Sequence, residues 1–236
     1  MRIGLVSYRC RNRDISFNMS QIELAMKRSA GKADVLCFGE AFLQGFDALC
    51  WDYETDRSYA VDLSSAAIAQ LRGWTLQYGI SLTVGYIEKE QDRLYSSCLV
   101  LSEGKIIHNY RRISKGWKES SKADEHYCEG KETDSFCLNG KRMKVALCGD
   151  LWDFPERFQT EDLLIWPVYV DYTVAEWNSG ALEEYAAQAA QAAEDVLMVN
   201  PISSDPVNHG GSFYFHKGKT AAGLPFDEEG ILTVDL

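Results

Sequence analysis

The chain has 236 residues, of which 46% are hydrophobic and 25% charged, a composition typical of a globular protein that buries a substantial core. Its formal net charge of -11 disfavours nucleic acid and anionic membranes as partners, because both would repel such a surface. No stretch rich in Pro, Gly or Ser divides the chain, so we expect a single domain over residues 1–236.

The distribution of apolar residues and cysteines indicates the compartment. No apolar run reaches the roughly 18 residues that span a bilayer, and the start, MRIGLVSYRC, turns polar too early for a signal peptide. The seven cysteines are odd in number, form no C-x-x-C pair and include Cys37 and Cys98 inside apolar runs. We therefore expect reduced thiols and a cytoplasmic protein.

The first part of the chain alternates predicted strands and helices. Apolar patterns predict strands over residues 2–8, 35–38 and 81–86, and helices over residues 18–30 and 66–78. Such alternation predicts crossover units around a largely buried sheet.

The pattern then changes to a hairpin. Residues 94–101 and 106–112 are strand-like, and Ser102-Glu103-Gly104-Lys105 between them is typical of a tight turn, so the sheet is expected to be mixed. A loop-rich segment follows over residues 114–136. Further predicted elements are strands over residues 144–148, 163–167, 196–200, 212–216 and 231–234, and an Ala-rich helix over residues 180–195.

Two common catalytic signatures and a metal site are not supported. Gly218-Lys219-Thr220 lacks the earlier glycine of a phosphate loop, and Gly210-Gly211-Ser212 lacks the last glycine of a nucleophile elbow. The four histidines have no spacing typical of metal ligands; they are His108, His126, His209 and His216. No metal or other cofactor is expected.

Polar residues follow three of the predicted strands. Glu40, Cys148 and Asn200 each stand at the carboxyl end of an apolar strand, the edge where open α/β sheets bind ligands. Cys148 is followed at once by Gly149, and such a junction frees backbone N–H groups that stabilise an oxyanion. A buried structural cysteine and a capping glutamate remain the alternatives. Together, Glu40 and Cys148 could act as base and nucleophile, because a free thiol with a pKa of about 8.5 is mostly protonated at neutral pH.

These residues resemble the nitrilase, or carbon–nitrogen hydrolase, superfamily. The resemblance rests on the strand that ends FGE at Glu40, on Asn109-Tyr110-Arg111-Arg112 with the lysines after it, and on ALCGD followed by FPE around Cys148. It extends over nearly the whole chain. It implies a four-layer α-β-β-α sandwich with two mixed β-sheets, and a homodimer or higher homo-oligomer.

The resemblance also implies a Glu-Lys-Cys triad, in which Glu40 and Cys148 match their motifs directly. Arg112 occupies the position where the family usually has its lysine. We predict Lys118 as the cation over Lys115, because Lys118 follows a glycine and an aromatic residue that could wall a pocket. Arg112 remains an alternative cation, although it could not give up a proton.

Further site residues are implied around this triad. The family's second glutamate resembles Glu125, which could instead pair with a loop lysine. Gly149 would supply an oxyanion donor, and Trp117, Trp152 and Tyr169 are candidate pocket walls. Trp152 stands where the family has an arginine, which puts recognition of a substrate carboxylate in doubt.

The predicted function is therefore hydrolysis of a small-molecule amide through a thioester on Cys148, with release of ammonia or an amine. A nitrilase or an N-carbamoyl hydrolase would use the same groups. A family member that binds without catalysis is the alternative from another class.

Overall fold

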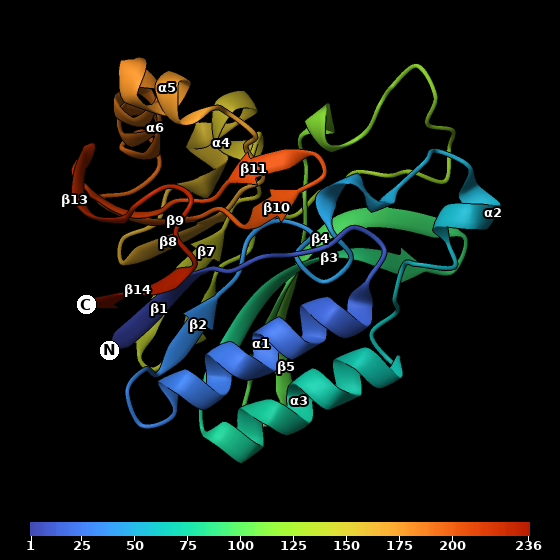
Figure 1. The fold of residues 1–236 in the computed structure, drawn as a ribbon, viewed down its shortest axis with the longest axis horizontal. Coiled ribbons are helices and arrows are strands. Elements are labelled where there is room, and N and C mark those ends of the chain that lie inside the picture. The colour runs from blue at the N-terminus through green and yellow to red at the C-terminus, as the bar shows by residue number, and fades with distance from the viewer.

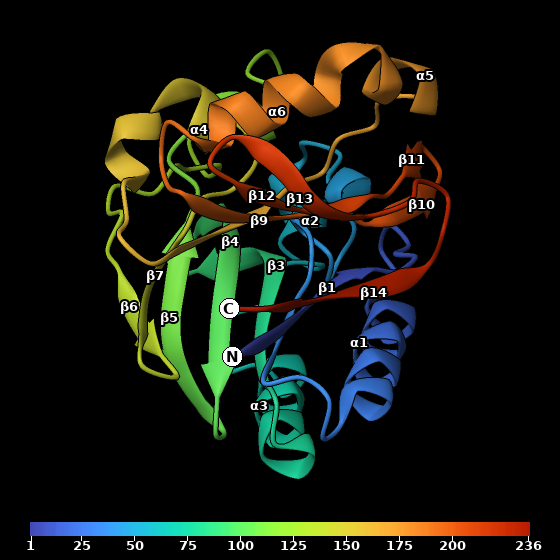
Figure 2. The same ribbon diagram turned by 90° about the vertical axis from the view of Figure 1, so that its left-hand side faces the viewer.

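The computed structural model describes residues 1–236, which form four layers (Figure 1). Two six-stranded sheets pack face to face, and helices cover the outer face of each. Figure 2 shows α1 and α3 below one sheet and α4, α5 and α6 above the other. This arrangement confirms the predicted α-β-β-α sandwich.

The first sheet has the strand order β14-β1-β2-β3-β4-β5. Its strands are β1 (Arg2–Ser7), β2 (Val35–Cys37), β3 (Ser81–Glu90), β4 (Arg93–Ser102), β5 (Lys105–Arg111) and β14 (Gly230–Asp235). β1, β2 and β3 run parallel, whereas β14, β4 and β5 pair antiparallel with their neighbours, so the sheet is mixed as predicted.

The second sheet has the order β13-β12-β9-β8-β7-β6 and is also mixed. Its strands are β6 (Phe136–Leu138), β7 (Lys141–Val145), β8 (Leu163–Pro167), β9 (Asp195–Val199), β12 (Ser212–His216) and β13 (Lys219–Leu224). β7, β8 and β9 are parallel, and the remaining pairs are antiparallel. A short separate hairpin is formed by β10 (Ile202–Ser204) and β11 (Val207–His209).

The helices are short, and none has the length and apolarity needed to cross a membrane. They are α1 (Ile15–Ser29), α2 (Tyr53–Asp56), α3 (Ala66–Tyr78), α4 (Asp150–Asp153), α5 (Val174–Glu176) and α6 (Leu182–Ala189). Asp14 caps the start of α1, where its side chain accepts from the N–H of Phe17, and Ser65 caps the start of α3, where it accepts from the N–H of Ile68.

Alternate residues of each strand point to opposite faces, and this divides the core in two. On β4, Cys98 and Val100 lie in the core between the sheets, whereas Leu99 and Leu101 lie in the core beneath α1 and α3. The same alternation continues to the end of β5 and decides which charged side chains reach the space between the sheets.

Several predicted boundaries differ from the structure. The strand predicted over 144–148 is β7, which ends at Val145. The segment after Val145 bonds to β8 less regularly than a strand does. That segment still follows β8, since the N–H of Cys148 donates to Pro167 O at 2.9 Å. The helix predicted over 180–195 is shorter, because Gly180 at φ 127 interrupts it and it ends at Ala189.

The sequence patterns missed the short strands β6, β10, β11 and β13. β6, β10 and β11 have three residues each, too few to show a period, and β13 carries mostly small and polar residues. Each pairs with the strand next to it in the chain. The predicted hairpin turn is confirmed, with Glu103 at φ 48 and Gly104 at φ 71, as a tight two-residue turn requires.

Gly85 of β3 gives a test of how the fold positions the site. A Cβ atom there would lie 2.4 Å from Gly39 O and 2.7 Å from Glu40 Cα. We expect Gly85→Ala to lower the free energy of unfolding by about 1–3 kcal/mol through overpacking. Gly73→Ala in α3 is the matched control: nothing lies within 4 Å of its added methyl, and it should stabilise by about 1 kcal/mol. Urea unfolding of both variants measures the two changes in the free energy of unfolding. Equal changes would contradict the close approach of Gly85 to the backbone of Gly39 and Glu40.

Candidate active site

Glu40 lies just beyond β2, at the carboxyl edge of the first sheet, and its side chain is fully buried. Its Oε1 accepts two hydrogen bonds, from Ser96 Oγ at 2.8 Å and from Arg112 Nη1 at 2.8 Å. Its Oε2 is buried and has no partner in the protein. One carboxylate oxygen is therefore held in place while the other remains available as a proton acceptor.

Arg112 follows β5 directly, and only 3% of it is exposed. Besides Glu40, it contacts Ser114, whose Oγ accepts from Nε at 2.7 Å. Burial, the largest single effect, opposes the charged guanidinium, but the acidic groups around it, with Glu40 first among them, together raise the pKa of Arg112 above its ordinary value. Arg112 is therefore a permanent positive charge at the site.

The preceding residue, Arg111, points to the other face of the sheet. Its guanidinium pairs with Glu88, with Nη2 to Oε1 at 2.6 Å and Nε to Oε2 at 2.9 Å, and also with Glu90. Because side chains alternate along a strand, only one of the two consecutive arginines faces Glu40.

Cys148 faces this pair from the second sheet. It adopts φ 42, a left-handed conformation that is strained for a residue with a side chain and recurs at functional sites. Its Sγ lies 3.8 Å from Tyr169 O, and its carbonyl accepts from Trp166 Nε1 at 2.9 Å. β8 and the segment directly after it thus hold the nucleophile candidate.

The electrostatics of Cys148 keep its thiol protonated at neutral pH. Burial raises the pKa of Cys148 to about 12, and the Glu40 carboxylate adds to this effect. Arg112 acts in the opposite direction and favours the thiolate. The thiol consequently needs a base to become a nucleophile.

Gly149 lies against the guanidinium of Arg112. A Cβ atom at Gly149 would be 2.5 Å from Arg112 Nη2, whereas its φ of -63 is open to any residue, so space and not conformation requires the glycine. Neither the Gly149 N–H nor Arg112 Nη2 donates a hydrogen bond within the chain. Two donors are therefore free beside the thiol, as an oxyanion site requires.

The lysines predicted from the sequence have other positions. Lys118 Nζ pairs with Glu129 Oε1 at 2.6 Å and donates to Tyr127 O at 2.5 Å, while Lys115 is exposed. Glu125 is exposed as well. The structure thus places Arg112, and neither lysine, on Glu40. The physical reason is that β5 carries residue 112 into the space between the sheets, and the chain then leaves the sheet as a loop.

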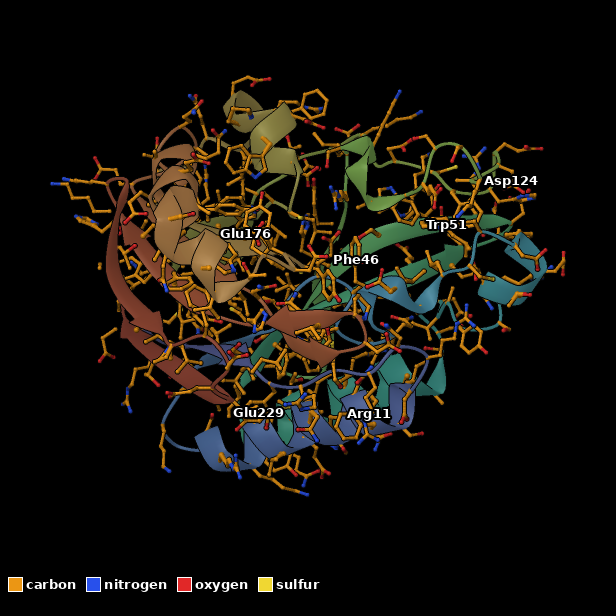
Figure 3. The ribbon with its side chains drawn as sticks, turned by 45° about the horizontal axis from the view of Figure 1, so that its top comes forward. Arg11, Phe46, Trp51, Asp124, Glu176 and Glu229 are labelled. Carbon is orange, nitrogen blue, oxygen red and sulfur yellow. The ribbon has the colours of Figure 1, made fainter.

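The three predicted pocket walls are distributed differently. Tyr169 is buried, its carbonyl faces Cys148 and its ring stacks on Phe46 at 4.7 Å between centroids. Figure 3 shows Phe46 near the centre of the molecule, at the junction of the sheets. Trp117 is buried with Trp51 and Tyr127 in a separate aromatic cluster. Trp152 is 42% exposed and packs edge-on against Tyr185, with 5.1 Å between the ring centroids.

Sequence reasoning missed Ser96, Ser114 and Tyr185. Ser96 precedes Cys98 by two residues on β4, so alternation alone could have placed it between the sheets. Ser114 and Tyr185 carried no comparable signal, and Tyr185 of α6 is close enough to Cys148 for the two groups to interact electrostatically.

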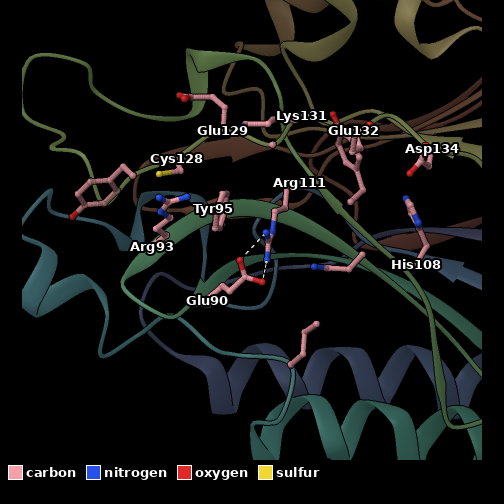
Figure 4. Close-up of a pocket in the computed structure, with 15 residues that line it drawn as sticks. Glu90, Arg93, Tyr95, His108, Arg111, Cys128, Glu129, Lys131, Glu132 and Asp134 are labelled. Carbon is pink, nitrogen blue, oxygen red and sulfur yellow. Dashed lines mark hydrogen bonds and ion pairs between the residues drawn. The ribbon is translucent and has the colours of Figure 1, made fainter.

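A groove of about 870 Å³ opens elsewhere, along β5 and residues 127–134 (Figure 4). Figure 4 shows Arg111 bound to Glu90 on one side of it, and Asp134 near His108 on the other. Glu40, Arg112 and Cys148 do not line this groove. The volume of this groove therefore does not make it the reactive site, because the residues that could carry out catalysis lie elsewhere.

Comparisons with known proteins indicate the family and the fold of this chain. The family model described as carbon-nitrogen hydrolase matches residues 2–236. An (R)-stereoselective amidase from a Pseudomonas species is 27% identical over 168 residues, covering 66% of this chain and 54% of the relative, so the match spans about half of that protein. An arylacetone-specific nitrilase from Alcaligenes faecalis is 24% identical over 100% of this chain and 76% of its own length.

Solved structures share the fold. XC1258 from Xanthomonas campestris, a CN-hydrolase superfamily protein with an arsenic adduct in its active site, has a TM-score of 0.80 at 19% identity over 99% of this chain and 89% of its own. An amidase from Nesterenkonia sp. AN1, in a variant with acrylamide added to its active-site cysteine, has a TM-score of 0.78 at 20% identity over 100% of this chain and 93% of its own. The resemblance inferred from the motifs is confirmed.

The buried ion pair can be tested by stability. Arg112→Met would leave the Glu40 carboxylate buried without its cation, so we expect the free energy of unfolding to fall by about 3–5 kcal/mol. Adding Glu40→Gln should recover part of the loss, because no unpaired charge then remains. Lys118→Met, which breaks a partly exposed pair, should cost about 1 kcal/mol or less. Equal losses for both single variants in urea titrations would contradict the pairing.

Proposed function

The chain belongs to the carbon–nitrogen hydrolase family, and we propose that it hydrolyses small amides through a thioester on Cys148. The observation that carries the proposal is the arrangement of Glu40. Arg112 and Ser96 hold its Oε1, and its buried Oε2 is free to take a proton. The amidase relatives support the choice of amides as substrates.

The first step forms the carbon–sulfur bond. Glu40 Oε2 takes the proton of the Cys148 thiol as sulfur attacks the carbonyl carbon, since the thiol is protonated at neutral pH. The electron pair of the carbonyl moves to oxygen. The free N–H of Gly149 and the Nη2 of Arg112 stabilise that oxyanion, and one such donor contributes about 2.7–4 kcal/mol to the transition state.

The second step breaks the carbon–nitrogen bond. The oxyanion collapses to a thioester, and Glu40, now protonated, gives its proton to the departing nitrogen, which leaves as ammonia or an amine. Water then attacks the thioester while Glu40 takes its proton. Collapse of this second oxyanion releases the acid, and the proton on Glu40 returns to the sulfur.

Arginine at position 112 limits how protons move in this scheme. A guanidinium retains its proton throughout, so Arg112 contributes charge and hydrogen bonds only. Glu40 therefore carries every proton transfer between the thiol, the leaving group and water.

A nitrile is the second candidate substrate, favoured by the match to an arylacetone-specific nitrilase along the whole chain. Glu40 would again take the proton of the thiol while the sulfur of Cys148 adds to the nitrile carbon. Ammonia release from a matched amide and nitrile pair, such as benzamide and benzonitrile, separates the two functions.

The nucleophile and base are tested by Cys148→Ala and Glu40→Gln. We expect ammonia release from a panel of small amides to be undetectable in the first and at least 100-fold slower in the second, because the base is lost. A Glu-to-Gln variant of the Nesterenkonia amidase carries the acetamide moiety of fluoroacetamide on its active-site cysteine, so we expect fluoroacetamide to modify Cys148, as detected by peptide mass. Cys137→Ala removes an exposed thiol on β6 and serves as the control. Turnover by Cys148→Ala would end the proposal.

The cation is tested by comparing two variants. Arg112→Met should lower kcat by about 100- to 1000-fold through loss of an oxyanion donor. Lys118→Met should change kcat by less than about threefold, because Lys118 is bound to Glu129. The reverse ranking would restore Lys118, the residue favoured by the sequence, as the catalytic cation.

A further inference from the structure

Asp150 is a buried carboxylate that the mechanism above does not use. It follows Gly149 and is fully buried. It accepts four hydrogen bonds, from Tyr110 Oη at 2.5 Å, Leu147 N at 2.8 Å, Ile113 N at 3.1 Å and Ser114 N at 2.8 Å. These donors come from two segments that are far apart in the sequence and belong to different sheets.

On one side, Asp150 closes the turn that carries the nucleophile. Its Oδ2 accepts from Leu147 N, while its own N–H donates to Leu147 O at 2.9 Å. Cys148 lies between them in its left-handed conformation at φ 42. The reciprocal bonds therefore offset the strain of a conformation that costs about 1–3 kcal/mol.

On the other side, Asp150 holds the end of β5. Its Oδ1 accepts from the N–H of Ser114, and the Oγ of Ser114 accepts from Arg112 Nε. Tyr110, which donates to Oδ2, precedes Arg112 by two residues and points to the same face. A continuous chain of bonds thus runs from Asp150 through Ser114 and Arg112 to Glu40.

We propose that Asp150 is a positioning residue that sets the placement of Arg112 against the Cys148 thiol, with Tyr110 as its support. The proposal rests on the assignment of Cys148 as nucleophile. The carboxylate suits this place because all four of its partners are donors, and an ionised carboxylate is a pure acceptor.

If Asp150 acted only through its charge, neutralising it would make the Cys148 thiol more reactive, whereas loss of a positioning residue would make it less reactive. The two roles can therefore be distinguished. The titratable and charged groups that interact electrostatically with Cys148 are Glu40, Arg112, Asp150 and Tyr185. The negative charge of Asp150 raises the pKa of the thiol, so neutralising Asp150 without moving anything would favour the thiolate. If Asp150 positions Arg112, its loss removes the one cation that favours the thiolate, and the thiol becomes less reactive.

The test is the alkylation of Cys148 by iodoacetamide in Asp150→Asn, followed by peptide mass between pH 7 and pH 10. Asparagine is isosteric but presents an NH₂ group to N–H or O–H donors. We expect the rate constant at Cys148 to fall at least tenfold at pH 9, and kcat for amide hydrolysis to fall more than KM changes. A rate constant equal to or above that of the unmodified sequence would overturn the proposal.

Asp56→Asn is the matched control. Asp56 is also fully buried and accepts from a tyrosine, Tyr127 Oη at 2.7 Å, and from backbone N–H groups, those of Cys50 and Trp51. It should lower thermal stability in the same way as Asp150→Asn but leave the alkylation of Cys148 unchanged. An equal loss of alkylation in both variants would reduce Asp150 to a general structural role and overturn the proposal.

Tyr110→Phe keeps the test decisive if Asp150→Asn does not fold. It removes one of the four donors, so we expect a smaller decrease in the alkylation rate, about threefold, and an unchanged rate would count against the proposal. Alkylation needs no substrate. Absence of ammonia release by the unmodified protein, together with the expected alkylation losses in the variants, would therefore refute amide hydrolysis while supporting the positioning role.

Discussion

The ion pair between Glu40 and Arg112 joins the ends of β2 and β5, which are separated in the sheet by β3 and β4. Gly85 on β3 leaves the space in which the Glu40 backbone lies, and Ser96 on β4 donates to the same carboxylate oxygen as Arg112. All four strands thus contribute to one buried contact. A buried pair of this kind contributes little net stability, because desolvation opposes the attraction, so its presence indicates a function.

The second sheet supplies the other half of the site. Cys148 is held by β8 on one side, and Asp150 ties its turn to the end of β5 on the other. The thiol, the carboxylate and the guanidinium therefore come together only when the two sheets pack. Glu40 and Arg112 are almost fully buried in this interior, which strengthens the interaction between their charges. The raised pKa of Cys148 is the direct consequence of that burial.

The guanidinium of Arg112 determines how the groups of this interior are connected. The guanidinium reaches Glu40 and Ser114 at once through different nitrogens and leaves Nη2 beside Gly149. A lysine carries one compact charge and could not bridge these partners in the same way. The glycine at position 149 fits this larger group, since any side chain there would meet Nη2.

Local patterns were sufficient for the parts of this protein that depend on neighbours in the chain. The apolar strands that precede Glu40 and Cys148, the helix over residues 66–78 and the hairpin at Gly104 were predictable because period, capping and turn chemistry act over a few residues. The motifs around the same two residues also indicated the family. By contrast, local sequence favoured Lys118 as the cation, and the tertiary structure paired it with Glu129 and placed Arg112 on Glu40. Which cation meets a carboxylate depends on strand alternation and on where the chain leaves the sheet, and both are decided by pairing across the sheet between residues far apart in the sequence.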